Sequence, residues 1–144
     1  MATRRANVLG LGLIGGSLAL ALKKNGFSVS GSDANSETEK LALEREIISA
    51  IGIDSDAEIS FVATPVTAIP AQVQLALKQT NGIVSDVGGV KASVVESIND
   101  PRFVGGHPMA GSELAGLDGA DESLFEGAVW GVKKVVPVYA AFFR

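Results

Sequence analysis

The sequence predicts an α/β fold, a doubly wound parallel sheet that forms a single domain. Short apolar runs that suit buried strands alternate with segments of good helix formers, and short links join them. Gly10, Gly12 and Gly15 have the G-x-G-x-x-G spacing between the first strand and the first helix. The chain is 47% hydrophobic and has 17 glycines in 144 residues, which suits a mostly buried parallel sheet with tight turns.

The composition excludes several classes of function. A formal net charge of -4 argues against nucleic-acid binding, because no broad basic face would neutralise phosphates. The absence of cysteine excludes disulfides, thiolate metal sites and cysteine nucleophiles, and a single histidine excludes a multi-histidine metal site. No apolar run reaches the roughly 18 residues of a membrane span. We therefore expect no metal, no membrane contact and a cytoplasmic location.

The first βαβ unit contains the glycine-rich turn. We predict a polar arm at residues 1–5, a buried strand over 6–9, a helix over 14–24 and a second strand over 27–31. Asp33 follows the second strand. This context, with a strand before the glycines, a helix after them and an acid at the next strand end, is typical of a dinucleotide-binding site.

Each part of this turn has a physical role in binding a dinucleotide. Gly10 permits the tight turn, Gly12 lets a pyrophosphate approach the backbone, and Gly15 lets the helix pack closely. The free amides and the dipole of the helix N-terminus attract phosphate. Asp33 is placed to accept hydrogen bonds from the adenosine ribose hydroxyls. The cofactor-binding turn therefore comprises Gly10, Leu11, Gly12, Leu13, Ile14 and Gly15.

A secretory signal is the alternative interpretation of this stretch. Arg4 and Arg5 would form its basic region, and residues 8–22 would form its apolar core. Four glycines interrupt that core, no clear cleavage site follows, and a second strand begins at once. We therefore favour the dinucleotide site.

The next segment predicts a charged surface helix and a turn. Ser36 and Glu39 have the spacing of a capping box, which predicts a helix over 37–50 whose charges form a solvated face. The acids at 54–56 suit a turn, because the full ligand pattern of a calcium loop does not follow them. A later helix is expected from Val66 or Ala68 to Lys78.

Two central strands, over 59–63 and 83–87, end at residues placed to contact a ligand. Ligands bind at the carboxyl ends of parallel strands. The segment Thr64, Pro65 and Val66 is therefore placed to touch the cofactor, although a plain strand stop explains it nearly as well. Asp86 is placed to orient a loop or the cofactor, and a structural role in the turn is the stronger interpretation.

The C-terminal part carries a candidate proton acceptor. We predict a helix over 91–98, a strand over 103–106 and a β-rich run over 128–138. His107 follows the strand, and an unperturbed histidine, with a pKa near ~6.5, takes a proton at neutral pH. Its alternative role is a hydrogen bond to a loop carbonyl. Glu113 either borders the same cleft or is a surface acid.

Five segments together resemble the prephenate/arogenate dehydrogenases of tyrosine biosynthesis, over residues from about 6 to 130. The His-Pro-Met-Ala-Gly segment is much more specific than the glycine spacing. The five segments are GLGLIGGS at 10–17, ATPV at 63–66, DVGGVK at 86–91, GGHPMAGSE at 105–113 and LFEGAVW at 124–130.

The resemblance implies a Rossmann NAD(P)-binding domain and an NAD-dependent oxidative decarboxylation. NAD+ takes a hydride from the ring carbon that bears the 4-hydroxyl of prephenate or arogenate, carbon dioxide leaves, and the ring becomes aromatic. His107 would bind the 4-hydroxyl and accept its proton, and Ser112 and Glu113 would lie near the active-site entrance. Asp33 matches the version that prefers NAD over NADP, because an acid there would repel a 2′-phosphate.

The chain departs from the family pattern in two places. Gly89 stands where the family usually has a serine whose hydroxyl contacts the substrate hydroxyl. Family members also continue into a helical domain that dimerises and supplies basic residues for the substrate carboxylates. We expect residues 1–130 to form the dinucleotide-binding domain and 131–144 a divergent tail, as in a truncated or frame-shifted fragment.

Such a fragment is expected to bind NAD and to have little or no dehydrogenase activity alone. Apolar surface that the helical domain would otherwise cover favours self-association into a homo-oligomer. Two rival interpretations are another small Rossmann reductase, of the imine or β-hydroxyacid type, and a non-catalytic NAD-binding module. The sequence leaves the choice between prephenate and arogenate open.

Overall fold

Seven strands and three α-helices make up the computed structural model, which describes residues 3–87, 98–109 and 129–132, with the backbone path for 106–109 and 129–132. The strands are β1 (Arg4–Leu9), β2 (Phe27–Ser32), β3 (Ala50–Ile51), β4 (Ile59–Val62), β5 (Ile83–Asp86), β6 (Phe103–Met109) and β7 (Val129–Val132). The helices are α1 (Leu13–Lys24), α2 (Ser36–Glu44) and α3 (Ile69–Gln79), and a 3₁₀ turn, η1 (Val66–Ala68), precedes α3.

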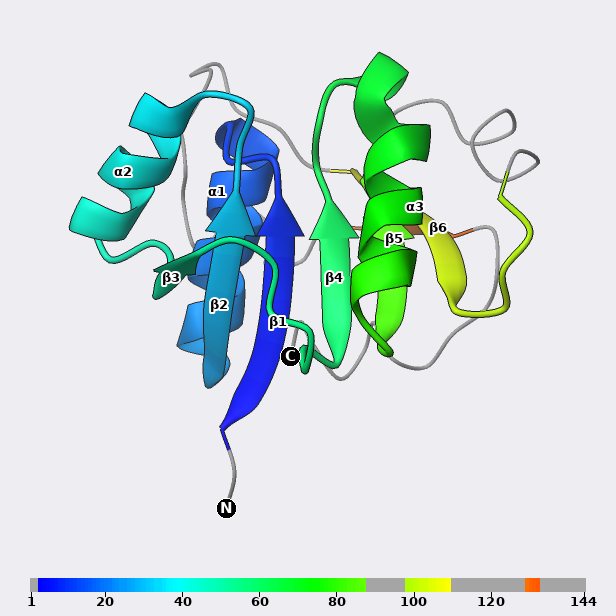
Figure 1. The fold of residues 1–144 in the computed structure, drawn as a ribbon, viewed down its shortest axis with the longest axis horizontal. Coiled ribbons are helices and arrows are strands. Elements are labelled where there is room, and N and C mark those ends of the chain that lie inside the picture. The colour runs from blue at the N-terminus through cyan, green and yellow to red at the C-terminus, as the bar shows by residue number, and fades with distance from the viewer. Residues whose placement is uncertain (1–2, 88–97, 110–128, 133–144) are drawn as a thin grey trace.

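The strands form one sheet in the order β3-β2-β1-β4-β5-β6-β7 (Figure 1). Every neighbouring pair from β3 to β6 is parallel, and β7 is antiparallel to β6. The parallel strands confirm the predicted doubly wound α/β sheet. β7 falls within the predicted β-rich run over 128–138, but its antiparallel direction was not predicted.

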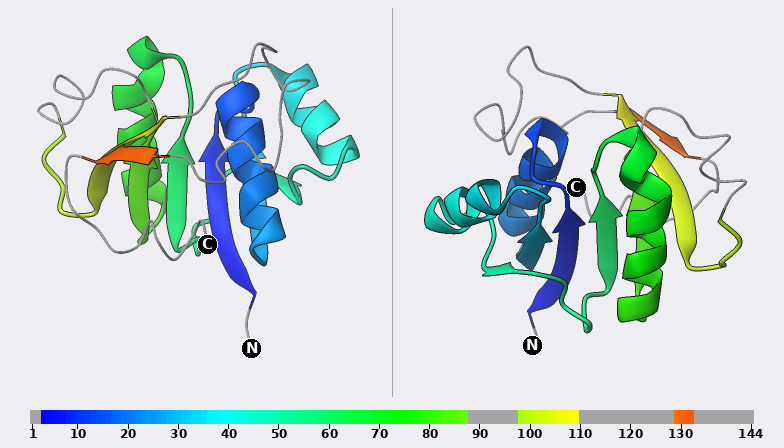
Figure 2. Two further views of the ribbon diagram at one scale, coloured as in Figure 1. Left: turned by 180° about the vertical axis from the view of Figure 1, so that it is seen from behind. Right: turned by 45° about the horizontal axis from the view of Figure 1, so that its top comes forward.

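Helices cover both faces of the sheet. α1 and α3 lie on opposite faces, as the front and back views show (Figures 1 and 2). Successive strand residues point to opposite faces. Val8 accordingly packs in a cluster with Leu18 of α1, and Leu9 packs in a second cluster with Val73 of α3. The central strands therefore lose water on both sides, which explains their continuous apolar runs.

The first strand starts earlier than the sequence predicts. Arg4 and Arg5 were expected in a polar arm, yet they pair with Phe27 and Ser28 as the first residues of β1. Their exposed side chains reach acids on the link between β3 and β4. A strand end needs only backbone pairing, so charged side chains at its solvent end are compatible with the ladder.

The helix expected over 37–50 ends at Glu44, and its last predicted residue belongs to β3. Glu46 has a φ of 58°, which stops the helix, and the Ile47 amide turns back to the Ala42 carbonyl at 2.9 Å. Ile47 and Ile48 are then buried in the core. Burial of these two side chains outweighs the helix propensity of the segment.

The cap of α2 is also one residue away from its predicted position. Asn35, and not Ser36, is the N-cap, because its side chain accepts a hydrogen bond from the Glu37 amide at 2.9 Å. Asn and Ser are equally good caps, so the local sequence alone did not separate them.

The strand expected over 103–106 continues to Met109. Gly105 is its last residue paired with β5, and from Gly106 onward it pairs with β7. His107 therefore lies within β6, opposite Gly131, and does not follow a strand end. The predicted boundary between residues 130 and 131 falls inside β7.

The other predicted elements within the described residues are confirmed to within one or two residues. Predictions for 91–97 and 133–138, and the Gly89 position, lie outside the described residues. Within the described part of the chain, no helix is long and apolar enough to cross a membrane.

Candidate functional site

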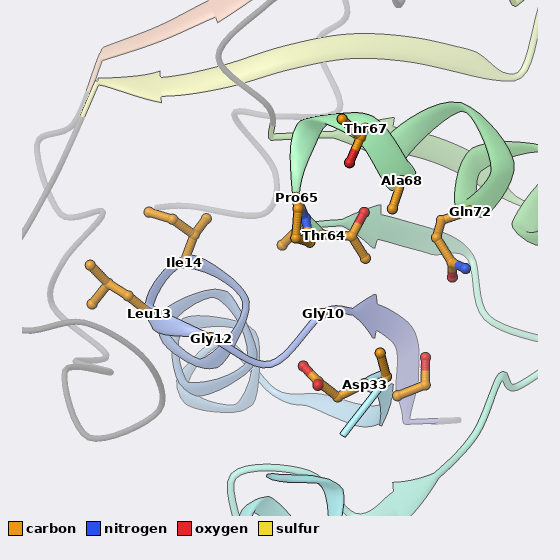
Figure 3. Close-up of a pocket in the computed structure, with 13 residues that line it drawn as sticks. Gly10, Gly12, Leu13, Ile14, Asp33, Thr64, Pro65, Thr67, Ala68 and Gln72 are labelled. Carbon is orange, nitrogen blue, oxygen red and sulfur yellow. The ribbon is translucent and has the colours of Figure 1, made fainter. Parts of the chain in front are cut away.

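A cavity of about 750 Å³ opens at the carboxyl end of β1, β2 and β4 (Figure 3). Its volume is within the range that small-molecule and cofactor sites have. The first turns of α1 and α3 form two of its sides. Its walls consist of Gly10, Gly12, Leu13, Ile14, Ser32, Asp33, Ala34, Ala63, Thr64, Pro65, Thr67, Ala68 and Gln72.

Two glycines of the turn are required by close backbone packing. Gly10 has a φ of +99°, and a Cβ there would lie 2.6 Å from the Ala63 carbonyl oxygen. A Cβ on Gly15 would lie 1.6 Å from the Gly10 carbonyl oxygen. The chain can therefore turn from β1 into α1 at this distance only with glycine at both positions.

Gly12 has a different environment, because a Cβ there would meet nothing within 4 Å. It is the N-cap of α1, and it supplies no side-chain hydrogen bond to the helix. The first turn of α1 carries no acidic residue. No side chain of α1 itself therefore neutralises the positive end of the helix dipole, and its first amides are available to a phosphate at the cavity.

Asp33 is held in place at the end of β2 by three contacts. Its Oδ2 accepts a hydrogen bond from the Leu11 amide at 2.8 Å, and its Oδ1 accepts one from the Asn35 amide at 2.9 Å. Its own amide donates to Glu39 Oε2 at 3.2 Å. A carboxylate has about four lone-pair sites, so Asp33 retains capacity to accept from ligand hydroxyls.

Glu39 places a second carboxylate beside Asp33. The sequence pattern predicts Glu39 in the capping box and on the solvated face of the helix, yet the structure brings it to the Asp33 backbone. Glu39 does not line the cavity, but its carboxylate next to Asp33 adds to the negative potential there, which opposes an additional phosphate group.

Thr64 carries a polar atom that the protein leaves unused. Its Oγ1 is buried and has no hydrogen-bond partner among the described residues. Thr64 and Pro65 line the cavity. A buried hydroxyl without a partner costs free energy, so its position in a cavity wall indicates that a ligand atom satisfies it.

Several residues that were predicted to contact the cofactor do not line the cavity. Leu11 is fully buried and serves the site through its backbone amide. Gly15 acts through packing, Val66 is 43% exposed, and neither lines the cavity. Asp86 is fully buried at the end of β5 and also lies outside the lining.

Six lining residues were not predicted from the sequence, and these are Ser32, Ala34, Ala63, Thr67, Ala68 and Gln72. Helical periodicity could have indicated one of these residues, Gln72. Gln72 follows Ala68 by four residues, and this spacing places two residues on the same face of a helix.

The described residues do not place the side chains of three predicted site residues. The backbone of His107 lies in β6, and its catalytic role stays a prediction. Ser112 and Glu113 lie outside the described residues. Within the described ranges, no three histidine, aspartate or glutamate side chains gather as a metal site.

Comparison with known proteins identifies the family. Residues 18–132 match the family model described as the prephenate dehydrogenase nucleotide-binding domain. This chain belongs to that family. The match begins after the glycine-rich turn, so the interpretation of the turn rests on its geometry.

Two curated relatives are prephenate dehydrogenases. The chain is 38% identical to that of Bacillus subtilis (strain 168) over 84% of this chain, and 35% identical to that of Lactococcus lactis subsp. cremoris (strain MG1363) over 85% of this chain. It covers 37% and 39% of these proteins, respectively.

Two solved structures of the family share the fold. The A. aeolicus prephenate dehydrogenase, in complex with hydroxyphenyl propionate and NAD+, superposes with a TM-score of 0.83 and 26% identity, over 94% of this chain and 52% of that one. The Synechocystis arogenate dehydrogenase gives a TM-score of 0.81 and 32% identity, over 95% and 53%. These relatives favour the prephenate/arogenate family over the alternative of another small Rossmann reductase.

Proposed function

We propose that this chain is the NAD-binding part of a dehydrogenase that oxidatively decarboxylates prephenate or arogenate. The observation that carries the proposal is the open N-terminus of α1 at the cavity, with Asp33 held beside it. The two curated relatives are named prephenate dehydrogenases, and the A. aeolicus relative was solved in complex with NAD+.

The residues present fit a dinucleotide. Gly12 leaves open space for a pyrophosphate against the first amides of α1, and Asp33 has lone pairs available for ribose hydroxyls. The unpartnered Thr64 hydroxyl fits a further polar group of the cofactor. The acids Asp33 and Glu39 disfavour the 2′-phosphate of NADP, so NAD is the expected cofactor.

Bound NAD+ would supply the hydride acceptor, and a residue of the chain would accept the proton. We place His107 at the 4-hydroxyl of the substrate, where it accepts the hydroxyl proton as the ring-carbon hydrogen leaves as hydride. The bond to the ring carboxylate then breaks, its electron pair enters the ring, and carbon dioxide departs. Ser112 and Glu113 border the substrate entrance in this proposal.

Isothermal titration of the purified chain with NAD+ and with NADP+ tests the cofactor assignment. We expect NAD+ to bind at least about tenfold more tightly than NADP+, a difference of about 1.4 kcal/mol. A wild-type chain that binds neither dinucleotide would overturn the proposal.

Turnover assays with prephenate and with arogenate, each with NAD+, test the reaction. Production of NADH with either substrate supports a dehydrogenase and identifies the substrate. Little turnover is expected of the fragment alone, so the assay is repeated with a helical domain of a relative added in trans. Binding of NAD+ with no turnover even then would instead favour the non-catalytic module. A cytoplasmic location and self-association stay predictions, and sedimentation of the purified chain tests the second.

A further inference from the structure

Gln72 is a polar side chain of the cavity that has no role in the cofactor contacts proposed for Gly12, Asp33 and Thr64. It projects from α3 into the cavity and is half-buried there (Figure 3). Within the described part of the chain, no hydrogen bond engages its side-chain amide. A glutamine amide offers two donors and an acceptor oxygen. A side chain with this capacity, placed in a cavity wall, is available to a ligand.

The order of residues along the cavity indicates which part of a ligand Gln72 meets. Leu13 and Ile14, at the start of α1, lie at one end, and Gln72 lies with Ala68 at the other (Figure 3). Asp33 lies between these ends in the same view. In a nucleotide, the ribose lies between the phosphate and the base. With the pyrophosphate at α1 and the ribose at Asp33, the base extends toward Gln72.

The neighbours of Gln72 suit a flat ring. Ala34 and Ala68 line the cavity with side chains of a single methyl group, which leave room for a base and offer apolar contact. Gln72 is the polar side chain of α3 in this lining. Glutamine pairs with adenine by accepting from the N6 amino group while it donates to a ring nitrogen.

We propose that Gln72 recognises the adenine base of the cofactor through the edge that carries the N6 amino group. This inference rests on the proposed NAD binding and adds a specificity-determining residue to it. Gln72 then favours adenine over bases whose N6 position is blocked, whereas Asp33 acts on the ribose.

The test compares two dinucleotides on two variants by equilibrium titration. The ligands are NAD+ and 1,N6-etheno-NAD+, whose etheno bridge blocks N6 and N1 of the base. The test variant is Gln72→Met, which keeps the length of the side chain and removes its amide. The control is Gln74→Met, because Gln74 is exposed on the same helix and does not line the cavity.

The wild type and the Gln74→Met control are expected to bind NAD+ roughly tenfold more tightly than etheno-NAD+, within the range of one bidentate base contact. Gln72→Met should bind NAD+ about tenfold more weakly and etheno-NAD+ unchanged, so that the discrimination disappears. Gln72→Glu keeps the acceptor and loses the donor, so we expect intermediate discrimination. It also serves as the second variant if Gln72→Met does not fold.

Two results would overturn the inference while leaving NAD binding intact. One is unchanged affinity of Gln72→Met for both ligands, and the other is an equal loss for both, which would indicate a general effect on the cavity. A wild type that binds neither ligand is a different result, because it contradicts the proposed function itself and the inference with it.

Discussion

The two edges of the parallel sheet use polar residues in opposite ways. At the amino edge, charged and amide side chains bond to one another and to backbone groups of the chain. At the carboxyl edge, the Thr64 hydroxyl and the Gln72 amide have no such partners among the described residues, and the start of α1 has no side-chain cap. This difference indicates that polar groups of the first edge serve folding and those of the second serve a ligand.

The amino edge is a network that joins β1 to the links before β4. Asn7 is fully buried, donates to the Asp54 carbonyl and to Ser60 Oγ, and accepts from the Asp54 amide at 2.8 Å. Arg5 bonds the Asp54 carboxylate through two nitrogens, at 2.6 and 2.7 Å. This hydrogen bond, followed by the charge of Asp54, raises the pKa of Arg5.

A side chain at the amino edge also caps the C-terminal end of α3. Arg102 donates to the carbonyls of Leu77, Thr80 and Gly82, at 2.5, 2.7 and 3.3 Å. A cation at a helix C-terminus opposes the negative end of its dipole. The corresponding positive end of α1, at the other edge, has no acidic residue in its own first turn and no side-chain cap.

The largest expected effects come from substitutions of two glycines in the turn between β1 and α1, which differ in their effect on stability. Gly15→Ala should lower the free energy of unfolding by about 3 kcal/mol and abolish NAD+ binding, because its Cβ would overlap the Gly10 carbonyl. Gly12→Ala should change stability by less than about 1 kcal/mol and still abolish binding, because its methyl fills the phosphate space. Urea unfolding and titration measure both quantities. A Gly12→Ala chain that binds NAD+ normally would contradict the assigned phosphate position.

The next prediction compares one substitution at each edge of the sheet, and the first of them is at the amino edge. Asn7→Ala should destabilise the fold by about 2 to 3 kcal/mol, because buried partners on Asp54 and Ser60 lose their hydrogen bonds. Its folded fraction should bind NAD+ with unchanged affinity.

Thr64→Val is the matching change at the carboxyl edge. Loss of an unpartnered buried hydroxyl should leave stability unchanged or raise it by up to about 1 kcal/mol. NAD+ affinity should fall about tenfold, which corresponds to one lost hydrogen bond. Thermal unfolding with and without NAD+ tests both variants. A large loss of stability in Thr64→Val would mean that the hydroxyl serves the fold.

The third prediction concerns the two acids. Asp33→Asn should improve NADP+ binding about tenfold at most, because Glu39 still opposes the 2′-phosphate. The double variant Asp33→Asn, Glu39→Gln should improve it further, and Glu39→Gln alone should leave NAD+ binding unchanged. Titration with both dinucleotides at two salt concentrations is the measurement. Equal NADP+ affinity of the single and double variants would remove Glu39 from the site.

The smallest expected effect is at the solvent end of β1. Arg4 pairs with Glu58 and lies 4.5 Å from the centroid of the Phe27 ring, and both charged side chains are largely exposed. Arg4→Met should change the free energy of unfolding by less than about 1 kcal/mol. NAD+ affinity should not change. A loss of binding in this variant would show that the two edges are coupled.

Local patterns were sufficient for most of the elements and for the core of the site. The glycine spacing, the helix after it and Asp33 after β2 depend on neighbours within a few residues, and the structure brings them together at one cavity. Thr64 and Pro65 were predicted because a strand must end at the ligand edge of a parallel sheet. The same reasoning named Val66 and Asp86, which lie outside the lining.

The βαβ unit and its glycine-rich turn follow from the amino-acid sequence, because sterics and periodicity within about 30 residues are sufficient to specify them. The folded chain was needed to reveal the early end of α2, the pairing of β6 with β7, the contact of Glu39 with Asp33, and the position of Gln72 in the cavity wall. Each of these depends on contacts beyond the local pattern. Their free energy comes from burial and pairing that appear only once the sheet has formed.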